Sequence, residues 1–281
     1  MYSPFVLRPL PWGDHKDRPY IRVPIRMGIP GRQTDPIAVC TALAWESAAV
    51  RAALSQVQPE GKRVWRGSVG NREVLVVTGG VGPRRTQQTL ERFTDVPFAA
   101  VLSVGCAGAL IPGLATGQLV LAPDVRMRSA EPEAQLERFP LDVRLLAYAR
   151  AAASQAAIPA AEGPLFTSAS VLFTPEDKAQ QGRATGAIAV EMESGVYAAF
   201  AAARGLPFLA LRVIFDPVDM TLPAIAGLTT PEGDVRLLKA AAYVVTHPHH
   251  LLVLLTLQRA QTAAAQALTR LCRALFPLLT Q

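Results

Sequence analysis

The sequence predicts an α/β protein of three layers, in which helices cover both faces of a central mixed β-sheet and further helices follow at the C-terminus. From Ile37 onward, short apolar runs alternate with segments of helical spacing. The apolar runs are not interrupted by polar residues at every second position, which indicates strands that are covered on both faces. Half of the 281 residues are hydrophobic and 18% are charged, so the chain can build one large core.

The N-terminal segment differs in composition from the rest of the chain. Pro and Arg recur over residues 1–36 without helical or strand periodicity, which predicts a flexible extension. Met27, within this extension, is a second candidate for the start of translation. We expect a catalytic domain over residues 37–233 and basic helices over residues 234–281 that pack on the same domain.

The first half of the domain is expected to form a strand, a helix, a hairpin, a second helix and two strands. The hairpin is predicted because two apolar segments flank a Gly70-Asn71 turn. In chain order, these elements are expected at Ile37–Leu43, Glu46–Leu54, Val64–Val69, Glu73–Thr78, Arg84–Phe93, Phe98–Val104 and Gln118–Ala122.

The second half is expected to form a long Ala- and Leu-rich helix, a strand, another helix and a further buried strand. These elements are expected at Leu141–Ala157, Ala187–Val190, Glu193–Arg204 and Pro207–Phe215. From Asp234 onward the chain is expected to be helical. In residues 254–275, apolar side chains recur at helical spacing, and Arg259, Arg270 and Arg273 share the opposite face. This basic stripe predicts either a solvated face or a contact with a membrane surface.

The charge distribution and the cysteine content indicate where in the cell the protein is expected, but they do not identify a binding partner. The net charge is +6, and no Asp or Glu follows Asp234, so the basic character is concentrated toward the C-terminus. Cys40, Cys106 and Cys272 are widely spaced, which argues against a disulfide framework and favours a reducing cytoplasm. The N-terminus shows no secretory signal. The longest apolar run, Leu251–Leu257, is well below the roughly 20 residues that span a bilayer. We therefore expect a cytoplasmic protein, with peripheral contact to the inner face of the membrane as an alternative.

Four features place glycine or polar residues at the ends of buried strands, where layered α/β sheets bind their ligands. Two lead into helices, one consists of small residues directly after a strand, and the fourth is a pair of apolar strands that end in acidic groups. In this order they are Thr41–Glu46, Thr78–Pro83, Ser103–Gly108, and the pair Val190–Ser194 and Arg212–Asp216.

The acidic residues among these carry the strongest functional signal. Glu193 and Asp216 end strongly apolar segments, where burial would raise the pKa of a carboxyl group. Because a buried carboxyl group without a role is costly, both are predicted to be functional. Glu46 lies at the start of a helix, where the helix dipole alone would favour an acidic residue. The glycine clusters are weaker signals, since an ordinary tight turn explains them as well.

Taken together, these segments resemble the nucleoside phosphorylase superfamily, of the purine nucleoside phosphorylase and methylthioadenosine/S-adenosylhomocysteine nucleosidase type. The resemblance runs in order from Ile37 to about Leu275. It is carried by Thr78–Pro83, Ser103–Leu110, Val190–Ser194 and Pro207–Asp216.

Within the superfamily, the chain is most similar to the hopanoid-associated nucleosidases or phosphorylases, which remove adenine from adenosylhopane. This similarity rests on Thr185–Ser194, on Asp216–Pro223 and on the additional basic helices at the C-terminus. The resemblance therefore implies cleavage of a purine nucleoside, with a lipid-linked adenine nucleoside as the substrate.

The resemblance implies a role for each candidate catalytic or ribose-binding residue. Asp216 takes the position of the general acid that protonates purine N7 while the C1′–N9 bond stretches. Glu193 takes the position of the carboxylate that binds the ribose hydroxyls below the developing positive charge, and Met192 that of the residue packed on the sugar. Glu46 matches the carboxylate that activates the attacking water, and Arg212 orients the acidic cluster.

Two further regions are implied by the resemblance. The base is expected near Leu172, Phe173 and Phe215, and the nucleophile or a phosphate near Gly80, Gly82, Ser103, Gly105 and Cys106. Two positions depart from the family pattern, since Phe215 replaces a frequent serine and Cys106 stands where other members have Ser, Thr or Ile. Phosphorylases of the superfamily commonly carry arginine at the position of Ser103. The absence of arginine at this position favours water over phosphate as the nucleophile, although Arg84 or Arg85 could supply the positive charge that binds phosphate.

The expected ligands and partners follow from this assignment. We expect a small-molecule nucleoside as substrate, no nucleic acid, no cofactor other than inorganic phosphate as a co-substrate, and a homo-oligomer. His247, His249 and His250 are expected to form a solvated turn, so no metal site is predicted. Two alternatives stay open: a nucleosidase for methylthioadenosine, S-adenosylhomocysteine or a futalosine-like substrate, and a non-catalytic nucleoside-binding protein.

Overall fold

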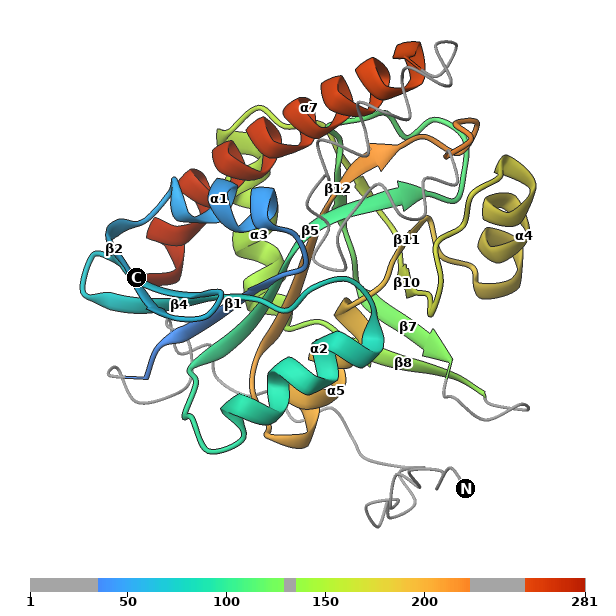
Figure 1. The fold of residues 1–281 in the computed structure, drawn as a ribbon. Coiled ribbons are helices and arrows are strands. Elements are labelled where there is room, and N and C mark those ends of the chain that lie inside the picture. The colour runs from blue at the N-terminus through green and yellow to red at the C-terminus, as the bar shows by residue number, and fades with distance from the viewer. Residues whose placement is uncertain (1–34, 129–134, 223–250, 281) are drawn as a thin grey trace.

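The computed structural model describes residues 35–128, 135–222 and 251–280, and these form the three layers expected from the sequence (Figure 1). Met27, nearly all of the extension over residues 1–36, residues 234–250 and the histidine cluster lie outside the described residues.

The central layer is a mixed sheet with 12 strands in the described part of the chain. Its main path runs through β2 (Ser55–Gly61), β3 (Val64–Val69), β4 (Arg72–Thr78), β1 (Ile37–Thr41), β5 (Ala100–Ala109), β11 (Ala189–Glu191), β10 (Leu165–Thr167), β7 (Asp124–Arg128) and β8 (Leu136–Pro140). Off this path, β12 (Phe208–Asp216) pairs with β5 and with β6 (Leu119–Leu121), and β6 pairs with β9 (Ala160–Glu162).

Helices cover both faces of this sheet (Figure 1). One layer consists of α1 (Ala44–Arg51), α3 (Val143–Gln155) and α7 (Leu251–Leu275), in which α7 packs on both of the others. The other contains α2 (Pro83–Leu90) and α5 (Ser194–Ala203). The helix α4 (Pro175–Thr185) lies beyond the ends of β10 and β11. Short 3-10 helices follow α2 and α7, at Glu91–Phe93 and Phe276–Thr280.

The strand β5 is the centre of the fold because three strands pair with it. β12 runs parallel to β5 along most of its length. On the other side, β1 pairs in parallel with Ala100–Ser103, and β11 pairs antiparallel with Gly108 and Ala109. β5 and β12 are almost wholly buried, as expected of apolar strands covered on both faces.

β5 extends further toward the C-terminus than the apolar pattern of the sequence predicted. The expected strand ended at Val104, and Ser103–Gly108 was interpreted as small residues after a strand. That boundary was wrong, since β5 continues to Ala109. The small side chains do not end the strand, because β12 continues to pair with it as far as Gly108.

The helix α7 confirms the amphipathic pattern that the sequence predicts for the tail. Ala264, Leu268, Leu271 and Leu275 are fully buried against the body of the protein. Arg259, Arg270 and Arg273 lie on the exposed face. Within the described ranges, no helix is both long enough and apolar enough to cross a membrane.

Candidate active site

A cavity of about 180 Å³ opens beside the C-terminal half of β5. Side chains and backbone from seven separate stretches of the chain line it. The lining residues are Ala42, Leu43, Glu46, Val81, Cys106, Ala107, Gly108, Ser170, Val171, Leu172, Val190, Glu191, Met192, Glu193, Phe215, Asp216 and Leu222.

The pairing of β5 explains why a cavity forms at this place. On the side of β5 away from β12, β1 pairs only as far as Ser103 and β11 pairs only with Gly108 and Ala109. Among the described residues, no strand pairs with Val104–Ala107 on that side. This stretch of backbone therefore needs other partners for its polar groups, and it is open to side chains and to a ligand.

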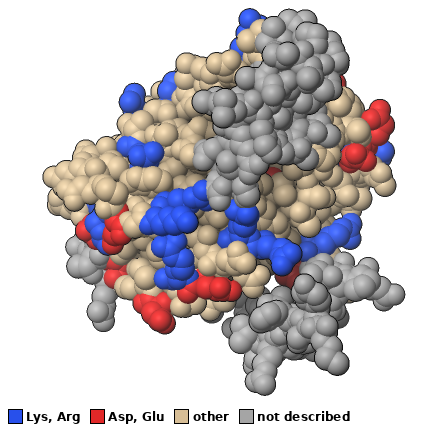
Figure 2. All heavy atoms as spheres, viewed as in Figure 1, with Lys and Arg blue, Asp and Glu red and all other residues tan. Residues whose placement is uncertain are grey.

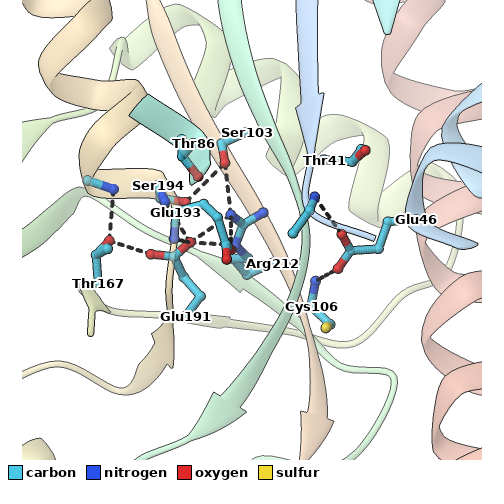
Figure 3. Close-up of polar contacts among 12 residues, drawn as sticks. Thr41, Glu46, Thr86, Ser103, Cys106, Thr167, Glu191, Glu193, Ser194 and Arg212 are labelled. Carbon is cyan, nitrogen blue, oxygen red and sulfur yellow. Dashed lines mark hydrogen bonds and ion pairs between the residues drawn. The ribbon is translucent and has the colours of Figure 1, made fainter. Parts of the chain in front are cut away.

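Glu46 occupies the gap beside β5. It lies in the first turn of α1 and is only 2% exposed. Its Oε1 accepts a hydrogen bond from the amide of Cys106 on β5 (2.9 Å) (Figure 3). Its Oε2 accepts from the amides of Ala42 and Leu43 (3.0 Å each). Three backbone donors thus fix the orientation of this carboxylate at the cavity wall.

Gly105 is required for this close packing. A Cβ at Gly105 would lie 2.7 Å from Oε1 of Glu46 and 3.0 Å from Nη1 of Arg212. A Cβ essentially never lies as close as 2.7 Å to another heavy atom, so any larger residue would force the Glu46 carboxyl group to shift.

Arg212 is the buried cation that contacts the two acidic residues Glu191 and Glu193. It lies on β12, is 2% exposed, and its Nη2 donates to Oε2 of Glu191 (2.7 Å) and to the hydroxyl of Ser103 (2.8 Å) (Figure 3). The same Nη2 lies 4.0 Å from Oε2 of Glu193. Burial works against the charged guanidinium, but the carboxylates of Glu191 and Glu193 raise the pKa of Arg212 further, so it is a permanent cation.

Glu191 is the ionised partner of Arg212. Its Oε2 also accepts from the amides of Glu193 (3.0 Å) and Ser194 (2.7 Å), and Thr167 donates its hydroxyl to Oε1. Burial raises the pKa of Glu191, but the Arg212 guanidinium and the hydrogen bonds overcome this effect and hold the pKa below its usual range.

The pKa of Glu193 shifts in the opposite direction to that of Glu191. Its Oε1 accepts from the amide of Gly82 (2.8 Å), and the residue is 6% exposed. Burial and the neighbouring charge of Glu191 raise the pKa of Glu193 to about 8. One guanidinium thus serves two carboxyl groups, and Glu193 is the one that holds a proton more easily.

Asp216 lies at the end of β12 and is 5% exposed. Its Oδ2 lies 2.6 Å from Nζ of Lys178, which projects from α4. Burial raises the pKa of the Asp216 carboxyl, and the Lys178 ammonium opposes this effect only in part. The carboxyl is therefore easier to protonate than an ordinary aspartate.

The cavity brings together most of the residues that the sequence selected. Glu46, Cys106, Met192, Glu193 and Asp216 line it, as do Leu172 and Phe215 from the expected base region. Burial and, after it, the Glu46 carboxylate raise the pKa of Cys106, so this position presents a neutral thiol.

The remaining predicted residues lie behind or beside the cavity. Ser103 is fully buried, with its hydroxyl bonded to Arg212 and to Ser194, so it acts as a support behind the cavity wall. Gly80 and Gly82 have positive φ values of 85° and 94° and shape the turn before α2. The side chain of Phe173 is 39% exposed and is not among the lining residues. Its carbonyl accepts from the amide of Leu222 (2.8 Å).

Two residues of the site were missed by the sequence analysis. Glu191 lies in the same Val-Glu-Met-Glu-Ser segment as Glu193, and its signal was the second carboxylate at a spacing of two. Lys178 lies in α4, a polar segment that was not predicted to be a helix. Only its pairing with Asp216 in three dimensions identifies it.

A sequence profile of the phosphorylase superfamily matches residues 36–273, so the chain belongs to this superfamily. This result confirms the family that the sequence motifs indicated. It identifies the chain as an enzyme that acts on N-glycosyl bonds.

Several solved structures share the fold at low sequence identity. The nucleosidase for 5′-methylthioadenosine and S-adenosylhomocysteine from Neisseria meningitidis, solved with methylthio-immucillin-A, is 17% identical over 86% of this chain and 99% of its own, with a TM-score of 0.65. The corresponding nucleosidase from Colwellia psychrerythraea, solved with adenine, is 19% identical over 88% and 96%, with a TM-score of 0.66. Futalosine hydrolase from Helicobacter pylori is 20% identical over 86% and 98%, with a TM-score of 0.62. These similarities confirm the predicted three-layer fold.

Proposed function

We propose that this enzyme hydrolyses the bond between adenine and ribose in a nucleoside. The observation that carries the proposal is the convergence on one cavity of carboxyl groups from three different elements. Glu46 comes from α1, Glu193 from the start of α5, and Asp216 from the end of β12. Acid, charge-stabilising and base functions are the three that cleavage of this bond requires.

Asp216 acts as the general acid. A purine leaves poorly as an anion, so N7 has to gain a proton while the bond from C1′ to N9 breaks. The raised pKa of Asp216 keeps a proton available at its carboxyl group. After the transfer, neutral adenine leaves and the carboxylate remains beside Lys178.

Glu193 and Met192 bind the sugar. Loss of the base leaves positive charge on C1′ and the ring oxygen, and the ionised form of a carboxyl group close to the ribose stabilises this charge. Because the pKa of Glu193 is raised to about 8, this ionised form is populated mainly at mildly alkaline pH. Glu193 lines the cavity next to Met192, whose thioether packs on the sugar face. Glu191, which also lines the cavity, accepts from the amide of Glu193, and Arg212 lies 4.0 Å from the Glu193 carboxyl group, so both fix its position.

Glu46 activates the attacking water. Its carboxylate is held by three backbone amides, so it accepts the proton of a water molecule without changing orientation. The water oxygen bonds to C1′, and its proton moves to Glu46. Cys106 adjoins this position and presents a neutral thiol where other members of the family have Ser, Thr or Ile.

The cavity favours a base bound by apolar contacts. Leu172, Val190 and Phe215 supply apolar surface around Asp216. The choice of adenine draws on two similar proteins, the nucleosidase from Colwellia psychrerythraea solved with adenine and the enzyme from Neisseria meningitidis named for methylthioadenosine.

We further propose that the group on the ribose 5′ carbon is a lipid, as in adenosylhopane. The support is an apolar surface at the cavity: Val171 is 41% exposed and lines it, and Phe173, 39% exposed, is tied to the lining residue Leu222. Exposed apolar side chains at the edge of a polar site are typical of an apolar ligand. A soluble methylthioadenosine- or futalosine-type substrate is the second candidate, favoured by the folds of the similar enzymes.

Release of free adenine tests both candidates. Purified enzyme is incubated with adenosylhopane in detergent or with methylthioadenosine, and adenine is measured by chromatography. We expect faster turnover of the lipid nucleoside. Faster turnover of the soluble nucleoside would favour the second candidate, and release from neither substrate would contradict the enzyme assignment.

The same assay separates water from phosphate as nucleophile. We expect the rate to be independent of inorganic phosphate and the product to be a free ribose compound. A ribose 1-phosphate product would identify phosphorolysis. The support for water is that Ser103, at the position where phosphorylases commonly carry arginine, is buried and bonded to Arg212.

The basic stripe of α7 is proposed to contact an anionic membrane surface. Arg259, Arg270 and Arg273 are exposed, although Arg273 also donates to the carbonyl of Ala52 (3.4 Å). Figure 2 shows that other basic side chains gather over α2 and toward β7 and β8. A binding test therefore has to distinguish α7 from the rest of the basic surface.

Co-sedimentation with vesicles of phosphatidylglycerol makes this distinction. Binding should fall when the three arginines of α7 are replaced by glutamine. A matched variant in which Arg128, Arg138 and Arg183, all exposed, are replaced removes the same charge elsewhere and should bind like the wild type. Equal losses in both variants would show that only net charge matters.

A further inference from the structure

Lys178 is a buried lysine whose ammonium contacts the proposed general acid. Its side chain is 1% exposed, and Nζ lies 2.6 Å from Oδ2 of Asp216. Nζ also donates to the carbonyl oxygens of Pro217 (3.0 Å) and Met220 (2.7 Å). A buried charge is costly unless it is fully paired, so such a lysine calls for a functional explanation.

The local structure of α4 holds Lys178 in this position. Thr174 caps the helix by accepting from the amide of Asp177 (3.1 Å), and Pro175 begins it. Lys178 and Gly182 are four residues apart and share one face of the helix. A Cβ at Gly182 would lie 2.8 Å from the carbonyl oxygen of Leu110, so the glycine lets α4 approach the end of β5 closely.

Two of the contacts of Lys178 are hydrogen bonds that Nζ donates to carbonyl oxygens, and the third is the ion-pair contact with Oδ2 of Asp216. One carboxyl oxygen and two carbonyl oxygens surround Nζ of Lys178. Carbonyl and carboxyl oxygens are acceptors, so these surroundings suit an ammonium group.

We propose that Lys178 positions Asp216 for proton donation and stabilises the carboxylate that remains after the proton has moved to the base. The ammonium occupies Oδ2, so the proton to be donated lies on Oδ1. When Oδ1 transfers this proton to N7, the new negative charge lies beside an existing positive charge. The inference rests on the proposed function of Asp216 as the general acid.

Few other ionisable groups influence Asp216 among the described residues. Lys178 approaches from α4, and the Cys106 thiol approaches from β5. Burial raises the pKa of Asp216, whereas Lys178 lowers it. Removal of Lys178 should therefore raise the pKa of Asp216 and make it a weaker acid.

Lys178 also connects the acid to the loop beyond β12. Its bonds to Pro217 and Met220 hold the segment that leads to Leu222, which lines the cavity. Lys178 thus holds both the proposed general acid Asp216 and the segment that forms one wall of the cavity. A purely structural anchor would affect substrate binding, whereas a positioning residue for the acid affects the proton-transfer step.

The pH dependence of adenine release separates these two roles. For Lys178→Met, kcat is expected to fall by about 10- to 100-fold with little change in KM. The alkaline limb of the kcat profile, where Asp216 loses its proton, should move up by about 1 to 3 pH units. The control is Lys62→Met, which removes an exposed lysine and should keep the wild-type profile. A raised KM with an unmoved alkaline limb would overturn the proposal.

A measurement without substrate keeps this inference separate from the proposed function. Aspartate labelled with ¹³C at the carboxyl carbon is incorporated, and the Asp216 signal is assigned by its absence in Asp216→Asn. Its titration should shift upward in Lys178→Met by about 1 to 3 pH units. An unchanged titration would refute the inference even in an active enzyme. A shifted titration in a protein that releases no base would support Lys178 while refuting the proposed function. If Lys178→Met does not fold, Lys178→Gln provides the same test, because its amide donates to the carbonyls without a charge.

Discussion

Replacement of Glu193 by glutamine should remove a loss of stability that the wild-type protein shows between about pH 5 and pH 8. In the folded protein, burial and the charge of Glu191 raise the pKa of Glu193 to about 8. In the unfolded chain the same group titrates near its ordinary value of about 4.3. Between these two values the unfolded state releases a proton that the folded state keeps, so the free energy of unfolding falls as the pH rises.

The size of this effect follows from the difference of the two pKa values. A shift from about 4.3 to about 8 corresponds to roughly 4 to 5 kcal/mol at about 1.4 kcal/mol per unit. Below about pH 4 both states are protonated and the term vanishes, and above about pH 8 it is complete. Glutamine keeps the shape and can accept from the amide of Gly82, but it does not titrate.

Urea unfolding at a series of pH values and constant ionic strength measures this term. The difference in unfolding free energy between Glu193→Gln and the wild type should grow in favour of the variant from pH 5 to pH 8. Glu137→Gln, at an exposed position, should follow the wild type throughout. Parallel curves for the wild type and Glu193→Gln would refute the argument that Glu191 and burial act on Glu193.

Four further outcomes follow from the site. Asp216→Asn should bind nucleoside with little change in affinity but release base at least about 100-fold more slowly, as single-turnover assays would show, because the variant lacks the donated proton. Glu46→Gln should reduce kcat by about 100-fold or more in a steady-state assay, since an amide accepts no proton from water. Gly105→Ala should stay folded by circular dichroism yet lose most activity, because the new Cβ would lie 2.7 Å from Glu46 Oε1; wild-type activity would contradict the close packing. Glu191→Gln should lower the free energy of unfolding by about 3 to 5 kcal/mol in urea melts at neutral pH, because it breaks a buried ion pair with Arg212.

Much of the fold could be predicted because its main strands have a strong local signal. β1, β5 and β12 are apolar runs, and the helices α1 and α5 directly follow β1 and β11. β2, by contrast, has the sequence SQVQPEG and is almost wholly exposed, so neither hydrophobicity nor alternation identifies it. It forms because hydrogen bonds to β3 satisfy its backbone, which is a tertiary effect.

The site could be predicted where chemistry and chain position coincide. Glu193 and Asp216 end apolar segments, and their acidity is unusual enough there to be noticed. Lys178 could not be found in this way, because α4 has few apolar residues and a lysine on a polar helix is ordinary. Its burial depends on the approach of α4 to the end of β5, which only the three-dimensional contact with Asp216 reveals.

The three different partners of β5 also bear on how the enzyme acquires its activity during folding. Glu46 follows β1, Glu193 follows β11 and Asp216 ends β12, so these three carboxyl groups reach one cavity only when β1, β11 and β12 have all joined β5. Such long-range pairings form slowly compared with local ones. Recovery of turnover after dilution from denaturant should therefore lag behind recovery of helical circular dichroism. The catalytic centre is in this sense a reporter for the completion of the whole sheet.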